Sequence, residues 1–109
     1  MDNIGERWWE AELHRLKGEL LLRQARGQIS RSPLHREAET CYHRALAIAR
    51  RQQAKSLVLR AAVSLCGLWQ QRGKMEEARQ LLAPIYGWFI GGVDTADVQE
   101  AGALLRQLA

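Results

Sequence analysis

No part of this 109-residue sequence is both long and uniformly apolar. The opening residues, MDNIGERWWEAEL, begin acidic and polar, which is unlike a secretory signal peptide. Nowhere does the chain approach the roughly 20 consecutive apolar residues that a membrane-spanning helix requires. We therefore expect a cytoplasmic protein that does not associate with membranes.

Cysteine and proline are also scarce, at two residues each. Cys41 and Cys66 both fall at inward positions of expected helices, where a free thiol packs like a small apolar group, so we expect no disulfide. The sequence lacks strand-length segments in which Val, Ile or Thr alternate with polar residues, whereas Ala, Leu, Arg, Gln and Glu are abundant. This composition predicts an all-α fold within a single domain.

Signatures of catalysis and metal binding are missing as well. The chain has no Gly-x-x-x-x-Gly-Lys-[Ser/Thr] phosphate loop and no nucleophile turn. His14, His35, Cys41 and His43 form neither a Cys-x-x-Cys nor a His-x-x-x-His pair, and Cys41 and His43 point to different faces of one helix. We therefore expect no enzymatic activity in this segment, no metal and no cofactor.

Apolar residues that recur at steps of three and four predict five helices, at about 5–24, 33–52, 56–73, 74–90 and 94–108. Gly73 is expected to end the third helix in a left-handed conformation, and Pro84 to kink the fourth. The expected inward stripes are Trp9, Leu13, Leu16 and Leu20; Ala38, Cys41, Tyr42, Ala45, Leu46 and Ala49; Leu59, Ala62, Leu65, Cys66 and Trp69; Ala78, Leu82 and Ile85; and Val98, Ala101, Leu104, Leu105 and Leu108.

The helical pattern repeats along the chain. Ala38, Tyr42 and Ala45 align with Ala78, Leu82 and Ile85 at an offset of 40 residues. His14, Lys17, Gly18 and Leu21 align with Ala62, Leu65, Cys66 and Trp69 at an offset of 48. A helix-turn-helix unit of about 34 residues, with an insertion near residues 26–33, accounts for both offsets.

These residues resemble a tetratricopeptide repeat. Ala38, Tyr42 and Ala45 match the alanine, aromatic and alanine of the family's second helix, and Gly73 precedes Ala78 by five residues, as in the family. Ile85 departs from the pattern, because the family has a small residue there. The matched packing positions are Gly18, Ala38, Tyr42, Ala45, Cys66, Trp69, Gly73, Ala78 and Leu82. The resemblance implies a right-handed α-α superhelix with one unit at about 5–53, a second at about 56–90 and a capping helix at about 94–108.

A narrower resemblance covers most of the chain. Its residues are RWWEAELHRLKGELLL, EAETCYHRALAIARRQQAKSLVLRAAVSLCGLW and EEARQLLAPIYGWFIGGVDTADVQEAGALL. They are similar to the C-terminal tetratricopeptide region of bacterial multidomain signalling proteins with an AAA/STAND-type ATPase, often linked to a class III adenylyl or guanylyl cyclase domain or a transcription-activation domain. That family usually has glycine at the position of Gln53. The resemblance implies a protein–protein interaction module with a sensor or regulatory role.

The resemblance also implies where partners would bind. The concave face of such repeats is formed by the first helix of each unit. The matching positions here are Glu12, Arg15, Glu19, Arg23, Arg60, Val63 and Gln70. This set mixes charges and lacks the Lys and Asn of the family's carboxylate clamp, so an acidic C-terminal peptide is not the expected ligand. Trp8 and Trp9 are candidates for self-association into a homodimer, or for docking preceding repeats in a longer chain.

Charge is distributed unevenly and leaves a second hypothesis open. Residues 23–55 carry eight basic and two acidic side chains, a net charge of +6, within a chain of net charge +4. Such a segment could contact phosphates of a nucleic acid. Specific recognition would require stacking aromatics beside the basic residues, and the tryptophans lie elsewhere in the sequence. We therefore rank a nucleic-acid-associated role second to protein binding.

Overall fold

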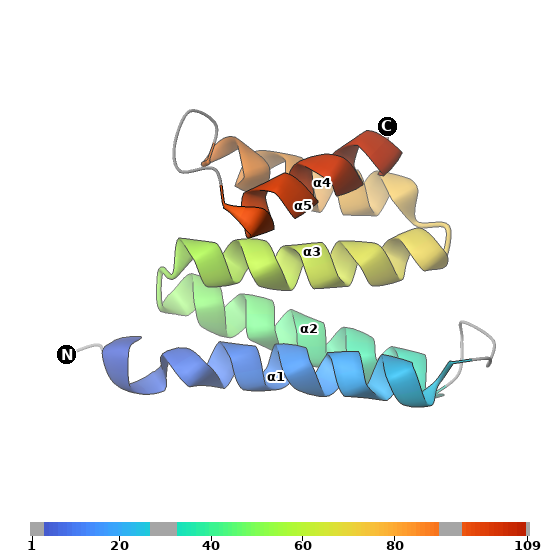
Figure 1. The fold of residues 1–109 in the computed structure, drawn as a ribbon. Helices are drawn as coiled ribbons and strands as arrows, with labels where there is room; N and C mark the ends of the chain where they lie inside the picture. Colours follow the sequence, from blue (N-terminus) through green and yellow to red (C-terminus); the bar gives the residue numbers. More distant parts are fainter. Residues whose placement is uncertain (1–3, 27–32, 90–94, 109) are drawn as a thin grey trace.

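The computed structural model describes residues 4–26, 33–89 and 95–108, and the side chains from residue 9 onward within them. Its five helices are α1 (Ile4–Gln24), α2 (Pro33–Arg51), α3 (Lys55–Gln71), α4 (Met75–Gly87) and α5 (Ala96–Leu108). Figure 1 shows that they stack in chain order from α1 at the bottom to α4 and α5 at the top. The all-α prediction is confirmed. Within the described ranges, no helix is apolar over a length that could cross a bilayer.

The helices form two layers. Each packs against the next in the chain, and α3 also packs against α1 and α5. As a result α1, α3 and α5 lie on one side of the molecule, while α2 and α4 lie behind them (Figure 1). The molecule measures 41 × 32 × 20 Å. Side chains that point outward from α1, α3 and α5 therefore share one face.

The predicted inward stripes of α2 and α4 are buried throughout, and those of α3 and α5 are buried except for the half-buried Trp69 and Leu105. Both cysteines are buried and free, as predicted. Helix α3 also buries Val58, Ala61 and Leu68 on its other sides, because it is the central helix and contacts α1, α2, α4 and α5.

The predicted stripe of α1 is wrong. Trp9, Leu13, Leu16 and Leu20 are 48%, 56%, 50% and 57% exposed. The residues that α1 buries are small, Ala11 and Gly18, and Ala25 directly after the helix is buried as well. Small residues allow α1 to lie close to α2, and they occupy the helix face opposite the Trp and Leu row. The large apolar residues are therefore directed away from the core.

The turns follow local backbone chemistry. Gly73 has a φ of 78° after α3, as predicted, and Gln53 has a φ of 56° after α2, at the position where the resembling family has glycine. The backbone N–H of Val98 donates to Oγ1 of Thr95 at 3.3 Å, so Thr95 caps α5. Helix α4 continues through Pro84 and ends at Gly87, before the expected end near residue 90.

Candidate binding groove

Three charged residues of α1 project toward α3. Glu12, Arg15 and Glu19 lie on one helix face because they are spaced at i, i+3 and i+7. Arg15 donates from Nε and Nη2 to the two carboxylate oxygens of Glu12, at 3.1 and 3.0 Å. Its Nη1 lies 3.7 Å from Oε2 of Glu19, which also accepts a hydrogen bond from Oγ of Ser64 at 3.2 Å. The hydrogen bond between Ser64 and Glu19 thus joins α3 to α1.

Arg60 connects three helices. From α3, its Nη1 donates to Glu12 of α1 at 3.1 Å, and its Nη2 donates to Oδ2 of Asp97 of α5 at 2.9 Å. The hydrogen bond to Asp97 is the main reason that the pKa of Arg60 is raised. Burial opposes the charge of Glu12, but Arg15 and Arg60 together lower the pKa of that carboxyl. The contacts of Arg60 with Glu12 and Asp97 therefore fix α1, α3 and α5 relative to one another.

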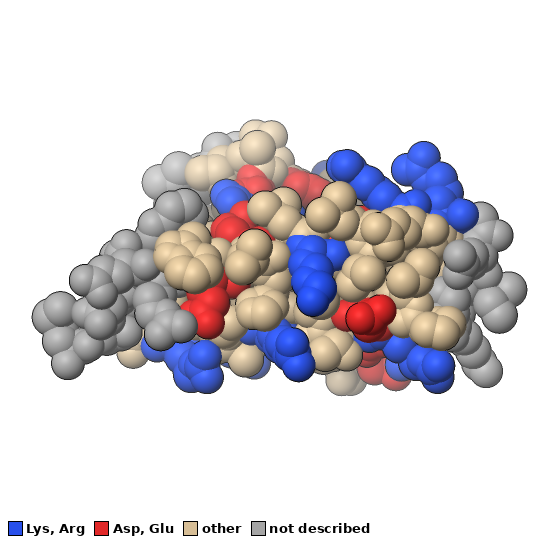
Figure 2. Space-filling view, turned by 90° about the horizontal axis from the view of Figure 1, so that it is seen from below, with Lys and Arg blue, Asp and Glu red and all other residues tan. Residues whose placement is uncertain are grey.

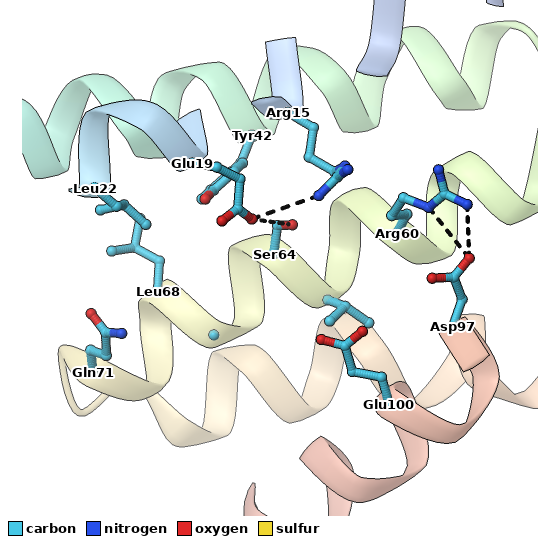
Figure 3. Close-up of a pocket in the computed structure, with 12 residues that line it drawn as sticks. Arg15, Glu19, Leu22, Tyr42, Arg60, Ser64, Leu68, Gln71, Asp97 and Glu100 are labelled. Carbon is cyan, nitrogen blue, oxygen red and sulfur yellow. Dashed lines mark hydrogen bonds and ion pairs between the residues drawn. The ribbon is translucent and has the colours of Figure 1, made fainter. Parts of the chain in front are cut away.

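These residues surround a cavity of about 250 Å³ between α1, α3 and α5 (Figure 3). Its lining residues are Arg15, Glu19, Leu22, Tyr42, Arg60, Val63, Ser64, Gly67, Leu68, Gln71, Asp97 and Glu100. A Cβ at Gly67 would have nothing within 4 Å, so the missing side chain helps to keep the space open. Its lining is mixed, with charged and polar side chains beside the apolar Leu22, Val63 and Leu68.

Most of the groove residues predicted from the sequence come together in this structure. Arg15, Glu19, Arg60 and Val63 line the cavity, and Glu12 is hydrogen-bonded to two of them. The other two lie outside it. Arg23 is exposed near the end of α1, and Gln70 donates from Nε2 to Oε1 of Gln107 at 3.0 Å.

Sequence reasoning missed the contribution of α5. Asp97 and Glu100 are three residues apart on α5 and line the cavity, although α5 was expected only to cap the stack. The predicted concave face comprised only α1 and α3, the first helices of the two expected units. Because α3 packs against α5 as well as α1, the face also includes α5. In the sequence, the three-residue spacing of these two carboxylates on the polar side of the last helix could have indicated that α5 contributes to this face.

A second polar cluster lies between α2 and the end of α3. Glu39 accepts a hydrogen bond from Nε1 of Trp69 at 3.1 Å and another from Nη1 of Arg72. His43 lies 3.5 Å from the same carboxylate, and its ring centroid is 5.9 Å from that of Trp69. Burial opposes the negative charge, but the Trp69 hydrogen bond and the charges of Arg72 and Lys74 lower the pKa of Glu39. This cluster connects the two helical hairpins.

The basic residues of segment 23–55 mostly lie on the surface. Arg23, Arg26, Arg36, Arg44, Arg50, Arg51 and Lys55 are exposed, and Arg31 is outside the described residues. Arg50 and Lys55 line a cavity of about 310 Å³ together with Gln53, Val58 and Trp88. The fold therefore places an exposed aromatic side chain beside two of the cations, which their sequence separation did not indicate.

Cys66 has no environment that would activate it. Its Sγ donates to the carbonyl oxygen of Ala78 at 3.2 Å, and burial raises the pKa of the thiol to about 12. Burial, with the nearby Glu19 carboxylate, also raises the pKa of Tyr42. Among the residues that the structure describes, no three His, Cys, Asp or Glu side chains are grouped to hold a metal ion.

Comparisons with models of protein families, with curated proteins and with solved structures found no match.

Proposed function

We propose that this chain is a non-catalytic protein–protein interaction module that binds a peptide segment of its partner in the groove of α1, α3 and α5. The tetratricopeptide-like positions support a role as the C-terminal sensor or regulatory part of a bacterial signalling ATPase or cyclase-type regulator in the cytoplasm. In that setting the two helical hairpins are repeat units and α5 is their cap. Any ATPase or cyclase activity would belong to other parts of the parent protein.

The observation that carries the proposal is the cavity lined by residues of α1, α3 and α5 together with Tyr42 of α2. Two of its charged side chains, Arg60 and Asp97, are hydrogen-bonded to each other, and Arg60 is also hydrogen-bonded to Glu12. A preorganised surface loses less conformational entropy when a ligand binds. Ser64 and Glu19 add polar contacts at the rim, while Leu22 and Val63 offer apolar area for a side chain of the ligand.

The charge of the groove indicates the class of ligand. Its lining contains the carboxylates Glu19, Asp97 and Glu100 but only two guanidinium groups, and those of Arg15 and Arg60 already contact carboxylates. Glu100 is exposed at the edge of the cavity. We therefore expect a peptide that presents Lys or Arg, which complements a surplus of negative charge. This expectation agrees with the absence of a carboxylate clamp.

The proposal can be tested by selecting binders from a random peptide library against the full chain and measuring their affinity by calorimetry. We expect the enriched peptides to be basic and to bind at micromolar strength, with affinity at least tenfold lower for Glu100→Lys. Glu37→Lys on α2 makes the same charge change at an exposed position of the other layer and should leave the affinity unchanged. Failure to enrich any peptide, or equal binding by both variants, would overturn the proposal.

A second candidate function rests on the Trp88 cavity. An exposed indole beside Arg50 and Lys55 is the combination with which proteins stack a base and contact a phosphate. The alternative is therefore a nucleic-acid-associated regulatory module that uses segment 23–55. It predicts binding to single-stranded oligonucleotides that weakens steeply from low to physiological salt and is lost in Trp88→Ala. A gel-shift titration without binding at low salt would remove this candidate.

A further inference from the structure

The outer face of α1 carries a continuous apolar row. Trp9, Leu13, Leu16 and Leu20 are each about half exposed, and together they extend roughly 17 Å along the helix at 1.5 Å per residue. Figure 2, viewed from below, looks onto the α1 side and shows uncharged side chains on this face with Lys, Arg, Asp and Glu side chains between and beside them. We call these four residues the α1 stripe. The stripe is about 100° around the helix from the groove residues of α1, so the two surfaces are distinct.

The spacing of the α1 stripe is the same in both directions. Its steps are four, three and four residues. An antiparallel copy of α1 therefore presents the same spacing, so that Trp9 meets Leu20 and Leu13 meets Leu16, twice each. Steps of four and three are those of a coiled-coil seam, in which such residues interlock. A two-fold interface requires this self-complementarity, since the same patch must serve both copies.

The area and the flanking charges of the stripe limit how strongly a second copy would bind. Four half-exposed large side chains present on the order of 400 Å² per copy, within the range of patches that are often functional in monomers. Two copies would bury on the order of 800 Å² before flanking residues are counted, which is less than the roughly 1,000 Å² of a stable specific interface and fits a weak, concentration-dependent dimer. Glu10 and Lys17 flank the stripe on the side away from the groove, and antiparallel pairing sets Glu10 of each copy beside Lys17 of the other. On the other flank Glu12 of each copy would lie near Glu19 of the other, where Arg15 already contacts both carboxylates.

We infer that the α1 stripe binds the α1 stripe of a second copy of this chain, antiparallel and with two-fold symmetry. This inference goes beyond the proposed function and does not rest on it, because none of the four stripe residues lines the groove. The dimer is expected to dissociate at micromolar concentrations, given its limited area. The contact uses Trp9, whereas the side chain of Trp8, the other residue considered from the sequence, lies outside the described residues.

The test is light scattering coupled to gel filtration, with the full chain loaded from micromolar to hundreds of micromolar concentrations. We expect the mass to rise from monomer to dimer over this range, and Leu13→Glu and Leu16→Glu each to give a monomer with an unchanged circular dichroism spectrum. Met75→Glu places the same charge on an exposed apolar residue of α4 and should leave the dimer intact. A wild-type chain that stays monomeric, or a dimer indifferent to both Leu substitutions, would overturn the inference.

Cross-linking tests the antiparallel order. A mixture of Leu13→Cys and Leu16→Cys chains should form a disulfide between positions 13 and 16 on oxidation, because Cys41 and Cys66 are buried. Efficient linkage of Leu16→Cys to itself would contradict this order. The monomeric Leu13→Glu variant should bind the selected peptides as the wild type does, so failure of the dimer and failure of the groove are distinguishable.

Discussion

The ring of Tyr42 lies directly against the backbone of Gly18. A Cβ placed at Gly18 would stand 2.6 Å from Cε1 of Tyr42 and 3.0 Å from its Cδ1, closer than packed carbon atoms approach. Tyr42 is fully buried in α2, so its ring has little room to move. A similar arrangement joins α4 and α5, where a Cβ at Gly102 would lie 2.9 Å from the hydroxyl oxygen of Tyr86. The glycines set how closely these helices approach.

We expect Gly18→Ala to destabilise the fold by about 1 to 2 kcal/mol, because overpacking outweighs the better helix propensity of alanine. Gly67→Ala is the matched control. It also lies inside a helix, but nothing stands within 4 Å of its Cβ position, so it should stabilise by about 0.5 to 1 kcal/mol. Urea unfolding followed by circular dichroism measures both. Changes of the same sign would contradict the Gly18–Tyr42 packing.

The left-handed residues after α2 and α3 predict opposite effects of glycine. Gln53 has a φ of 56°, a conformation in which a side chain is strained, so Gln53→Gly should stabilise the chain by roughly 0.5 to 1 kcal/mol. Gly73 has a φ of 78°, and Gly73→Ala should destabilise it by about 1 kcal/mol although the space beside it is open. Thermal melts distinguish these outcomes. A loss of stability in Gln53→Gly would show that contacts of the Gln53 side chain stabilise the fold by more than its left-handed backbone conformation costs.

The Glu39 cluster predicts a loss of stability in acid. The pKa of Glu39 is lowered from 4.5 in the folded chain, so the unfolded chain binds more protons and stability rises with pH. This contribution is complete above pH 4.5 and is lost as the pH falls through the lower, folded value. Glu39→Gln should cost roughly 1 kcal/mol at neutral pH and show a flatter profile below pH 4.5. Glu37→Gln, at an exposed position of the same helix, should keep the wild-type profile.

The packing of α2 to α5 was predictable because each of these helices has one dominant row of apolar residues at helical spacing. Helix α1 has two. Its larger row, which includes Trp9 and Leu13, gave the stronger hydrophobic signal but faces outward. The smaller residues face the core, because close approach to Tyr42 requires glycine at position 18. Aligning Gly18 with Cys66 in the repeat pattern indicated the correct face, whereas hydrophobic periodicity alone indicated the wrong one.

The α1 and α3 residues of the groove were predictable because periodicity places Glu12, Arg15 and Glu19 on one face of a helix. The approach of Asp97 to Arg60 was not, since 37 residues separate them and their contact depends on how α5 packs against α3. The cavity beside Trp88 likewise depends on the position of α4 relative to the α2–α3 turn. Local spacing predicts which residues share a helix face, and tertiary packing decides which faces meet.

Chemical-shift mapping tests the central claim most directly. The ¹⁵N-labelled Leu13→Glu variant, expected to be monomeric, is titrated with a selected basic peptide while its amide signals are followed. We expect the largest shifts to cluster on the groove face of α1, α3 and α5, around Glu19, Ser64, Gly67 and Glu100, and to vanish in Glu100→Lys. Shifts confined to α2 and α4 would contradict the claim that this layer forms the binding surface.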